Sequence, residues 1–258
     1  MDWKLTKSLY IVVFLLINVA LLVMYYNKQQ EDVREIEDAP SVLESTNIDL
    51  SRLPEYNPEQ LTILSGERID FEEIEEIDKD NAEVTDEDYI LHENFATGDS
   101  APAMEQASLE AHKDEQVYRG GDYQYDDVMS NEDYMLFNQY YGDYPIFNHE
   151  AARILYRGEG AEAEEYEQGY ISNLRENSQT SPVTVRNPRQ VISDLYLRER
   201  ISGEAVIENA RLGYYIILSD EEQVLLRPKW EFQVTDQDVE KSIYVDAISE
   251  TEDIIESE

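Results

Sequence analysis

Residues 211–248, RLGYYIILSDEEQVLLRPKWEFQVTDQDVEKSIYVDAI, decide the fold. They contain four runs rich in β-branched and aromatic residues, which favour strands. The runs are 211–219, 223–226, 230–234 and 242–248. Between them lie an acidic triplet, then Pro228, then a polar segment. Because proline and clustered polar residues interrupt strands, the pattern predicts a sheet of four short strands.

A helix is predicted immediately before these strands, over residues 187–200. Asn187 is a favoured N-cap residue, and Pro188 suits the first helical position. The apolar residues that follow recur at helical spacing on one face: Val191, Ile192, Leu195 and Tyr196. The local signals for a helix start and for an apolar face therefore agree.

Farther towards the N-terminus the signals are weaker. Asn148 and Gly158 bracket a segment that predicts a second helix. Residues 61–71 predict a hairpin with its turn at Gly66. Seven tyrosines lie in residues 118–147, and they favour either a sheet, which we prefer, or an aromatic groove that binds sugars.

The segment SLYIVVFLLINVALLVMYYN, residues 8–27, is strongly apolar. No charge lies between Lys7 and Lys28, and its 20 residues would span about 30 Å as a helix, the thickness of a bilayer core. A cleaved signal peptide has a shorter apolar region followed by small residues, which this segment lacks. An uncleaved transmembrane helix is therefore predicted.

Flanking charges set the orientation of this helix. Lys4 and Lys7 precede it, whereas the residues after it are mainly polar and acidic. Positive flanks stay in the cytoplasm, so residues 1–7 are predicted to form a cytoplasmic stub, with the bulk of the chain outside the cell membrane.

Asn18 places an amide in mid-span, one helical turn after Phe14. A hydrogen bond from this amide to another helix would contribute about 0.6 to 2 kcal/mol. Asn18 and Phe14 are thus candidate contacts with a transmembrane partner, although a single Asn is also tolerated beside backbone or water.

Composition divides the remaining chain. Residues 28–45 predict an acidic stalk, 46–249 an extracytoplasmic domain, and 250–258 an acidic tail. The predicted fold class is α+β: one N-terminal transmembrane helix followed by a domain of antiparallel sheet with packed helices.

The chain is strongly acidic, with 58 Asp and Glu against 20 Lys and Arg and a net charge of −38. Such a charge repels nucleic acid and anionic wall polymers, so nucleic-acid binding is excluded. The acidity suits either solubility in a demanding exterior or docking of a basic partner. With no cysteine, disulfides and thiol catalysis are excluded.

Signatures of catalysis and metal binding are missing from the sequence. His92, His112 and His149 are widely spaced, and neither H-E-x-x-H nor G-x-S-x-G occurs. The carboxylate-rich residues 72–88 lack the spacing of a calcium loop. We therefore predict no catalytic residue, metal or cofactor, although 58 carboxylates leave a glycosidase-type pair open.

Two ends of the chain resemble one family. The N-terminus has a D-W-x-x-x-K opening and F-L-x-x-N within the span, at Phe14, Leu15 and Asn18. The C-terminus has G-Y at Gly213 and Tyr214, then P-x-W, then Y-V-D-A; the residues that carry these last two motifs are Pro228, Trp230 and Tyr244. This combination resembles YycI, also called WalI, of low-GC Gram-positive bacteria, with Asp246 where the family usually has Asn.

The resemblance implies a non-enzymatic accessory protein. Members pair with YycH, a larger protein of the same single-span topology, and the pair contacts the sensor histidine kinase WalK (YycG). That kinase phosphorylates the response regulator WalR, which controls genes of cell-wall metabolism. The resemblance also implies that the C-terminal motif residues are structural. The alternatives are a membrane-anchored adhesin or wall-binding module and a surface hydrolase.

Overall fold

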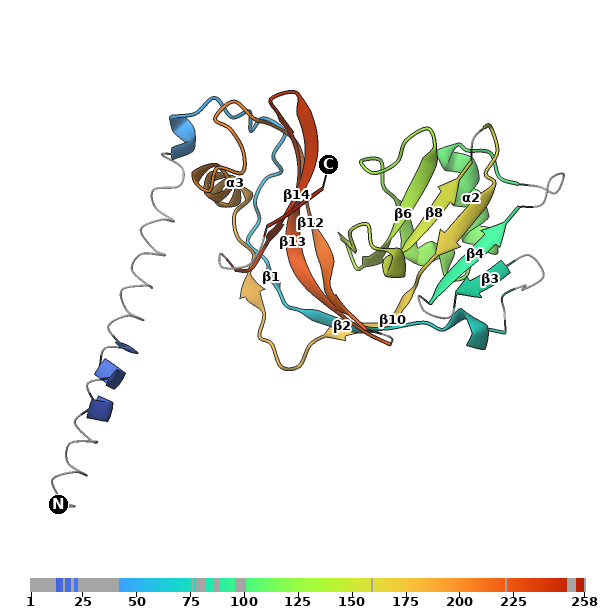
Figure 1. Ribbon diagram of the computed structural model, residues 1–258, viewed down its shortest axis with the longest axis horizontal. Helices are drawn as coiled ribbons and strands as arrows, with labels where there is room; N and C mark the ends of the chain where they lie inside the picture. Colours follow the sequence, from blue (N-terminus) through green and yellow to red (C-terminus); the bar gives the residue numbers. More distant parts are fainter. Residues whose placement is uncertain are drawn as a thin grey trace, which may run out of the picture.

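The computed structural model describes residues 13–15, 17–19, 21–22, 42–75, 77, 82–85, 89–95, 101–158, 160–220, 222–249 and 254–257. They form two lobes, each built on an antiparallel sheet (Figure 1). The described residues of 42–68 and 171–257 make up the C-terminal lobe. Those of 69–170 make up the inserted lobe, so the domain expected over 46–249 has two parts.

The sheet of the C-terminal lobe is organised around one long strand. Its strands are β2 (Leu64–Arg68), β10 (Ile171–Glu176), β12 (Val206–Ser219), β13 (Gln223–Asp236), β14 (Val239–Asp246) and β15 (Ile255–Ser257). β12 pairs with β13 along its length, while β2 and then β14 pair with the opposite side of β13. A separate pair joins β1 (Gln60–Leu61) to β11 (Val183–Thr184).

Strands in this region are confirmed, but the predicted break at Pro228 is wrong, because β13 runs through it. The carbonyl of Pro228 accepts a hydrogen bond from Ala247, so its nitrogen faces the same side of β13. On that side β2 pairs with residues 223–226 and β14 with residues 229–236. Pro228 thus lies where one neighbour replaces the other, and its missing N–H removes no ladder bond.

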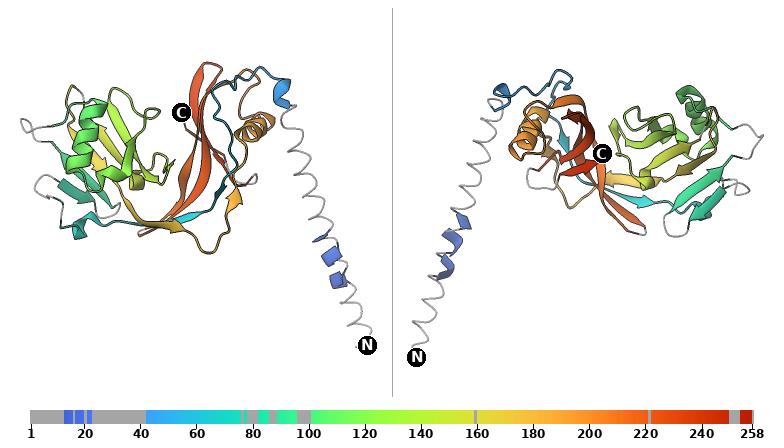
Figure 2. Two further views of the ribbon diagram at one scale, coloured as in Figure 1. Left: turned by 180° about the vertical axis from the view of Figure 1, so that it is seen from behind. Right: turned by 45° about the horizontal axis from the view of Figure 1, so that its top comes forward.

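The helix predicted after Asn187 is confirmed as α3 (Pro188–Leu197), which ends three residues earlier than 200. The Asn187 side chain accepts a hydrogen bond from the Arg189 N–H, as an N-cap should. Three buried side chains of α3 pack on β13 and β14 in the largest core: Val191, Ile192 and Leu195. This helix and the inserted lobe flank opposite faces of the sheet (Figures 1 and 2).

The inserted lobe is a second antiparallel sheet with one covering helix, α2 (Gln106–Gln116). The strand order is β3-β4-β9-β8-β6-β5, and β7 pairs with β6. The strands are β3 (Ala82–Thr85), β4 (Ile90–Asn94), β5 (Tyr123–Tyr125), β6 (Tyr134–Tyr141), β7 (Tyr144–Pro145), β8 (Arg153–Arg157) and β9 (Glu165–Gln168). Short 3₁₀ turns lie at Phe71–Glu73, Gly120–Asp122 and Glu150–Ala152.

The helix predicted over residues 148–158 is wrong. A 3₁₀ turn at Glu150–Ala152 leads into strand β8, in which Ile154, Leu155 and Tyr156 are all buried. Successive strand residues point to opposite faces, and β8 lies inside its sheet between β6 and β9. With both faces covered, the polar and apolar alternation that identifies a strand is lost.

The hairpin predicted at Gly66 is also wrong, because β2 passes straight through this residue and pairs with β10 and β13. A Cβ atom added at Gly66 would lie 2.4 Å from Cγ2 of Ile171. The glycine therefore permits close packing between β2 and β10 and does not form a turn.

The predicted segments at the two ends are only partly described. The helical residues 42–44 include Leu43, which packs into the main core, so the C-terminal lobe begins within the predicted stalk. The predicted acidic tail contains β15, which pairs with β14. Residues 1–7, most of residues 8–27 and all of residues 28–41 lie outside the described residues. Among the described residues, we find no helix that could cross a membrane.

Candidate functional site

The two lobes meet at a cluster of buried charges, which we call the junction. Arg211 on β12 donates from Nη1 and Nη2 to both carboxylate oxygens of Asp126 in the inserted lobe, at 3.1 and 3.0 Å. The Nε of Arg211 donates to Glu231 on β13. Asp126 is 2 % and Glu231 1 % exposed, so one guanidinium serves two carboxylates away from water.

Neighbouring side chains complete the hydrogen bonds of both carboxylates. Asn138 donates to Asp126, and the Tyr244 hydroxyl donates to Glu231 at 2.9 Å. Burial raises the pKa of Glu231, and Arg211 offsets this only in part. Burial acts to lower the pKa of Arg211, but the charges of Glu231 and Asp126 outweigh it and hold the pKa above its ordinary value. Burying the charges of the junction thus costs desolvation free energy, but its carboxylates have hydrogen-bond partners that offset this cost.

A backbone contact lies beside these charges. The Phe147 N–H donates to the Tyr214 carbonyl at 2.8 Å, which attaches the segment after β7 to β12. A Cβ atom at Gly213 would lie 2.5 Å from the carbonyl oxygen of Pro145 and 2.7 Å from the Phe147 ring. The ring of Phe147 also packs against Tyr244. Only glycine at position 213 allows this approach.

The chain connections provide a second link between the lobes. The N–H of Ile69 donates to the Tyr170 carbonyl where the chain enters and leaves the inserted lobe. The side-chain amide of Gln139 on β6 both donates to the carbonyl of Ile171 and accepts from its N–H, at 2.7 and 2.9 Å. The Gln139 side chain therefore adds a polar link between the lobes to the one made by Arg211.

Of the five C-terminal motif residues, Gly213 and Tyr244 face the junction. Tyr214 contributes its backbone carbonyl to the contact with Phe147, and its ring packs against other tyrosines. Pro228 lies opposite Tyr214 on the neighbouring strand. Trp230 points to the other face, where its ring is buried in the main core and its Nε1 donates to the Arg186 carbonyl at 3.0 Å. The motif thus contributes to both faces of the sheet.

At the N-terminus, the described residues include both candidate contacts. The Nδ2 of Asn18 donates to the Phe14 carbonyl at 2.8 Å, within the same helix. An amide has a second N–H and a carbonyl oxygen, so this bond leaves hydrogen-bonding capacity for a partner. The proposed contact with another helix stays a prediction.

Sequence reasoning missed the charged residues of the junction. Asp126, Arg211 and Glu231 carry no local signature, and the chain has 58 carboxylates from which to choose. Arg211 and Gly213 lie two residues apart on β12, so both face the same side of the sheet. A glycine at that spacing indicates that another part of the chain covers this side. No sequence signal points to Asp126, which is 85 residues away from Arg211.

The tyrosines of residues 118–147 lie in the sheet, as preferred. Six of the seven are on β5, β6 and β7. Tyr123 is buried and the other six are half-buried, several of them packed edge-on against other rings. This packing counts against a tyrosine-lined sugar groove.

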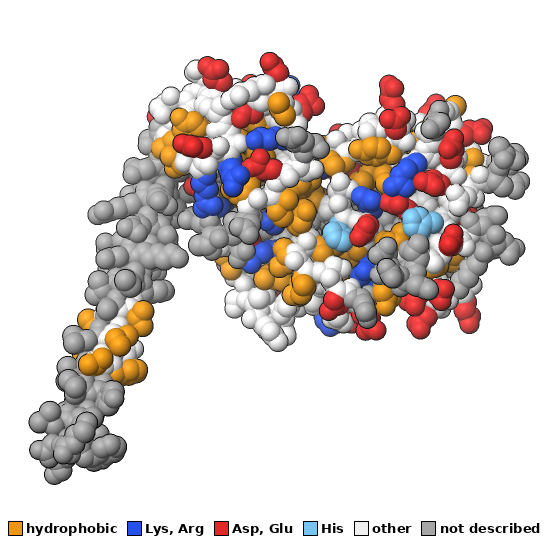
Figure 3. All heavy atoms as spheres, viewed as in Figure 1, with side chains coloured by type: hydrophobic (Ala, Val, Ile, Leu, Met, Phe, Trp, Pro, Cys, Tyr) orange, Lys and Arg blue, Asp and Glu red, His pale blue; other side chains and the backbone are white. Residues whose placement is uncertain are grey.

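Two of the three histidines take part in packing and turn contacts. His112 forms a hydrogen bond with the Tyr156 hydroxyl at 2.9 Å, and burial lowers its pKa. The Nδ1 of His149 accepts from the Ala151 N–H. Within the described ranges, no three His, Asp or Glu side chains converge to hold a metal ion. Figure 3 shows acidic side chains spread over both lobes.

Comparison with known proteins agrees with the sequence motifs. The family model described as YycI protein matches residues 26–248. The chain belongs to the YycI family. A solved structure of an uncharacterized protein from Eubacterium rectale has a TM-score of 0.43 and 10 % identity, covering 78 % of this chain and 87 % of that chain. Among curated proteins, none matches.

The YycI match includes the whole junction. Asp126, Arg211 and Glu231 all lie within residues 26–248, as do the five C-terminal motif residues. The N-terminal candidates Asn18 and Phe14 precede the matched region, so the family assignment rests on the part of the chain after the predicted span.

Proposed function

We propose that this YycI-family chain is a non-enzymatic accessory regulator of the WalK (YycG) sensor kinase and acts together with a YycH-like protein. The observation that carries the proposal is the family match over residues 26–248. Residues 8–27 anchor the chain in the cell membrane, with the N-terminus in the cytoplasm and both lobes outside. Regulation then requires contacts that favour one signalling arrangement of the kinase over another.

The form of the two lobes supports a role in protein contacts. The junction joins them through buried charges and a backbone hydrogen bond, so they would move and bind as one head. Such a head presents a defined surface to a partner, while the span brings a helix beside the helices of the kinase. The alternative of a wall-binding module would need exposed aromatic rings, whereas the tyrosines at 118–147 are buried or half-buried in the sheet.

Photo-crosslinking in intact membranes tests the proposal. A photoreactive amino acid placed at Phe14 or Asn18 should capture the YycH-like protein or WalK after illumination. A second photoreactive probe in the exposed loop at Gln237 reports separately on contacts of the head. Recovery of neither partner from either position, or release of the mature chain into the medium, would overturn the proposal.

A measurement of signalling complements the capture. Deletion of the gene should change transcription from WalR-dependent promoters, and the full-length chain should restore it. A chain whose residues 8–27 are replaced by an unrelated span should fold but restore less, if span contacts transmit the signal. Unchanged transcription in the deletion strain would contradict a regulatory role.

A further inference from the structure

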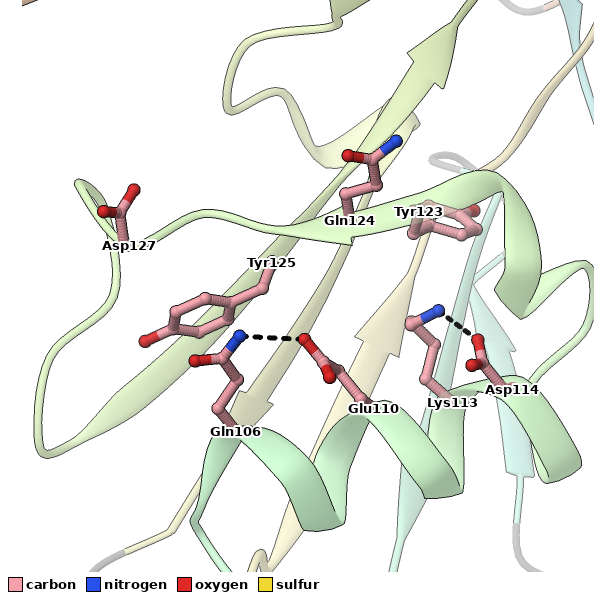
Figure 4. A pocket seen from close by; sticks show the side chains of 8 residues that line it. All are labelled: Gln106, Glu110, Lys113, Asp114, Tyr123, Gln124, Tyr125 and Asp127. Atoms are coloured by element: carbon pink, nitrogen blue, oxygen red, sulfur yellow. Dashed lines mark hydrogen bonds and ion pairs between the residues drawn. The ribbon is translucent and has the colours of Figure 1, made fainter. Parts of the chain in front are cut away.

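A groove in the inserted lobe lies between α2 and the strand β5 (Figure 4). Its volume is about 510 Å³, within the range of sites that hold a small ligand or a few residues of peptide. Four lining residues come from α2 and four from β5 and the turn after it: Gln106, Glu110, Lys113, Asp114, Tyr123, Gln124, Tyr125 and Asp127. None of these residues belongs to the junction.

The strand that lines this groove is at the edge of its sheet. β5 pairs with β6 and ends the strand order, so its other side has no neighbouring strand among the described residues. The Asp126 N–H donates to the Leu136 carbonyl on β6. Along an antiparallel strand, the backbone groups of successive residues point to alternate sides. The N–H and C=O of Gln124 therefore face β6, whereas those of Tyr125 face outward.

Tyr123, which precedes Gln124 and Tyr125, follows the same alternation. The Tyr123 N–H turns away from β6 and donates to the Gly120 carbonyl, which leaves its C=O as an outward acceptor. The edge of β5 thus offers an acceptor, a donor and an acceptor in sequence, from Tyr123 and Tyr125. This is the pattern that an added strand uses to pair with a sheet.

Side chains around the groove indicate the kind of strand that fits. Glu110, Asp114 and Asp127 place carboxylates along it, and Gln106 holds one oxygen of Glu110 at 2.8 Å. The ammonium of Lys113 is buried and already bonded to Asp114 and to the Gly120 carbonyl, so it does not face an incoming cation. The local charge therefore favours a basic occupant.

The floor of the groove supplies an apolar contact. Tyr125 is half-buried and packs edge-on against Phe137, at 5.5 Å between ring centroids. In an added strand, alternate side chains would point towards α2 and away from it. A sequence that alternates basic and β-branched residues would then meet both the carboxylates and the rings.

We propose that the groove between α2 and β5 binds an extended, basic peptide segment by strand addition to the outer edge of β5. Backbone hydrogen bonds to Tyr123 and Tyr125 supply the register, and the carboxylates of Glu110 and Asp127 select Lys or Arg side chains. The proposal goes beyond the role in kinase regulation and does not depend on it.

The test uses the full-length chain in nanodiscs and a fluorescein-labelled peptide, acetyl-Lys-Val-Lys-Val-Lys-Val-amide. Binding is followed by fluorescence anisotropy. Tyr125→Pro removes the outward N–H, while Tyr125→Ala removes the ring and keeps that N–H. We expect Tyr125→Pro to weaken binding about tenfold more than Tyr125→Ala, because one backbone hydrogen bond is lost.

A second pair of variants separates the groove from the general acidity of the chain. Glu110→Gln with Asp127→Asn should weaken binding about tenfold, whereas Glu132→Gln with Asp133→Asn makes the same charge change outside the groove and should have little effect. Circular dichroism melting of every variant checks that the fold is intact.

Peptide chemistry gives a readout that does not depend on the variants. N-methylation of the peptide amides that face β5 should abolish binding, and methylation of the alternate amides should leave it unchanged. Equal effects of both charge pairs, or equal binding of the two methylated peptides, would overturn strand addition in favour of unspecific attraction. Equally tight binding of lysine methyl ester alone would overturn it in favour of a small-cation site.

Discussion

At the scale of single residues, what faces a position across the junction determines which amino acid can occupy it. Gly213 and Glu231 illustrate two different constraints. Gly213 is fixed by steric exclusion, because the inserted lobe touches the backbone at that point. Glu231 is fixed by charge, because it shares one guanidinium with Asp126.

Gly213→Ala should destabilise the protein by about 1 to 3 kcal/mol, as overpacking does, because the new methyl group would overlap Pro145 and Phe147. Chemical denaturation followed by tyrosine fluorescence measures this change. Gly121→Ala is the control, since nothing lies within 4 Å of a Cβ atom there. Equal stability of the two variants would mean that the lobes do not pack at Gly213 as described.

Glu231→Gln should gain stability relative to the wild type as pH rises above 4.5, the ordinary pKa of a glutamate side chain. Burial raises the pKa of Glu231 above this value in the folded state, so the wild type loses folding free energy as pH rises towards the folded-state pKa. The difference can change by at most about 1.4 kcal/mol per pH unit. Urea unfolding at several pH values measures it, with the exposed Glu240→Gln as control; a difference independent of pH would contradict the prediction.

At the scale of elements, α3 and β13 share the main core of the C-terminal lobe. The indole of Trp230 is 5 % exposed and donates to the Arg186 carbonyl, just before α3 begins. One side chain thus joins the sheet to the start of the helix, in addition to filling the core. This explains why a helix of ten residues is held firmly on the sheet.

Trp230→Ala should cost about 3 to 5 kcal/mol, because a large buried ring is replaced by a cavity. Trp230→Phe keeps most of the packing and should cost only about 1 to 3 kcal/mol, mainly from loss of the hydrogen bond to the Arg186 carbonyl. Thermal and urea unfolding compare the two variants. An unchanged melting temperature for Trp230→Ala would show that the ring is not part of the core.

At the scale of the whole molecule, the acidic surface and the buried junction act together. The net charge of −38 favours solubility and repels anionic polymers, but self-repulsion weakens a compact fold. The junction and the hydrogen bonds between the Gln139 side chain and Ile171 hold the lobes against this repulsion. High salt should therefore stabilise the head, because it screens the surface charges more than the buried ones.

Asn18→Leu should weaken recovery of the membrane partner about fivefold, which corresponds to about 1 kcal/mol. The substitution removes the Asn18 amide, including the N–H and carbonyl oxygen that are not used in the bond to Phe14, while both lobes keep their fold. Co-purification from membranes measures the effect, and Asn18→Gln, which keeps an amide, is the control. If Asn18→Leu recovers as much partner as the wild type, the span contact is made by other residues.

The sequence by itself determined the C-terminal strands, the helix that Asn187 begins, the acidic surface and the family. These features depend on propensity, capping and composition, which act over a few residues. Only the tertiary structure decided that β13 continues through Pro228, that Gly66 lies in a strand and that residues 153–157 form β8 rather than a helix. It alone joined Arg211 to Asp126, because the free energy of a buried contact depends on partners that folding brings together from distant parts of the chain.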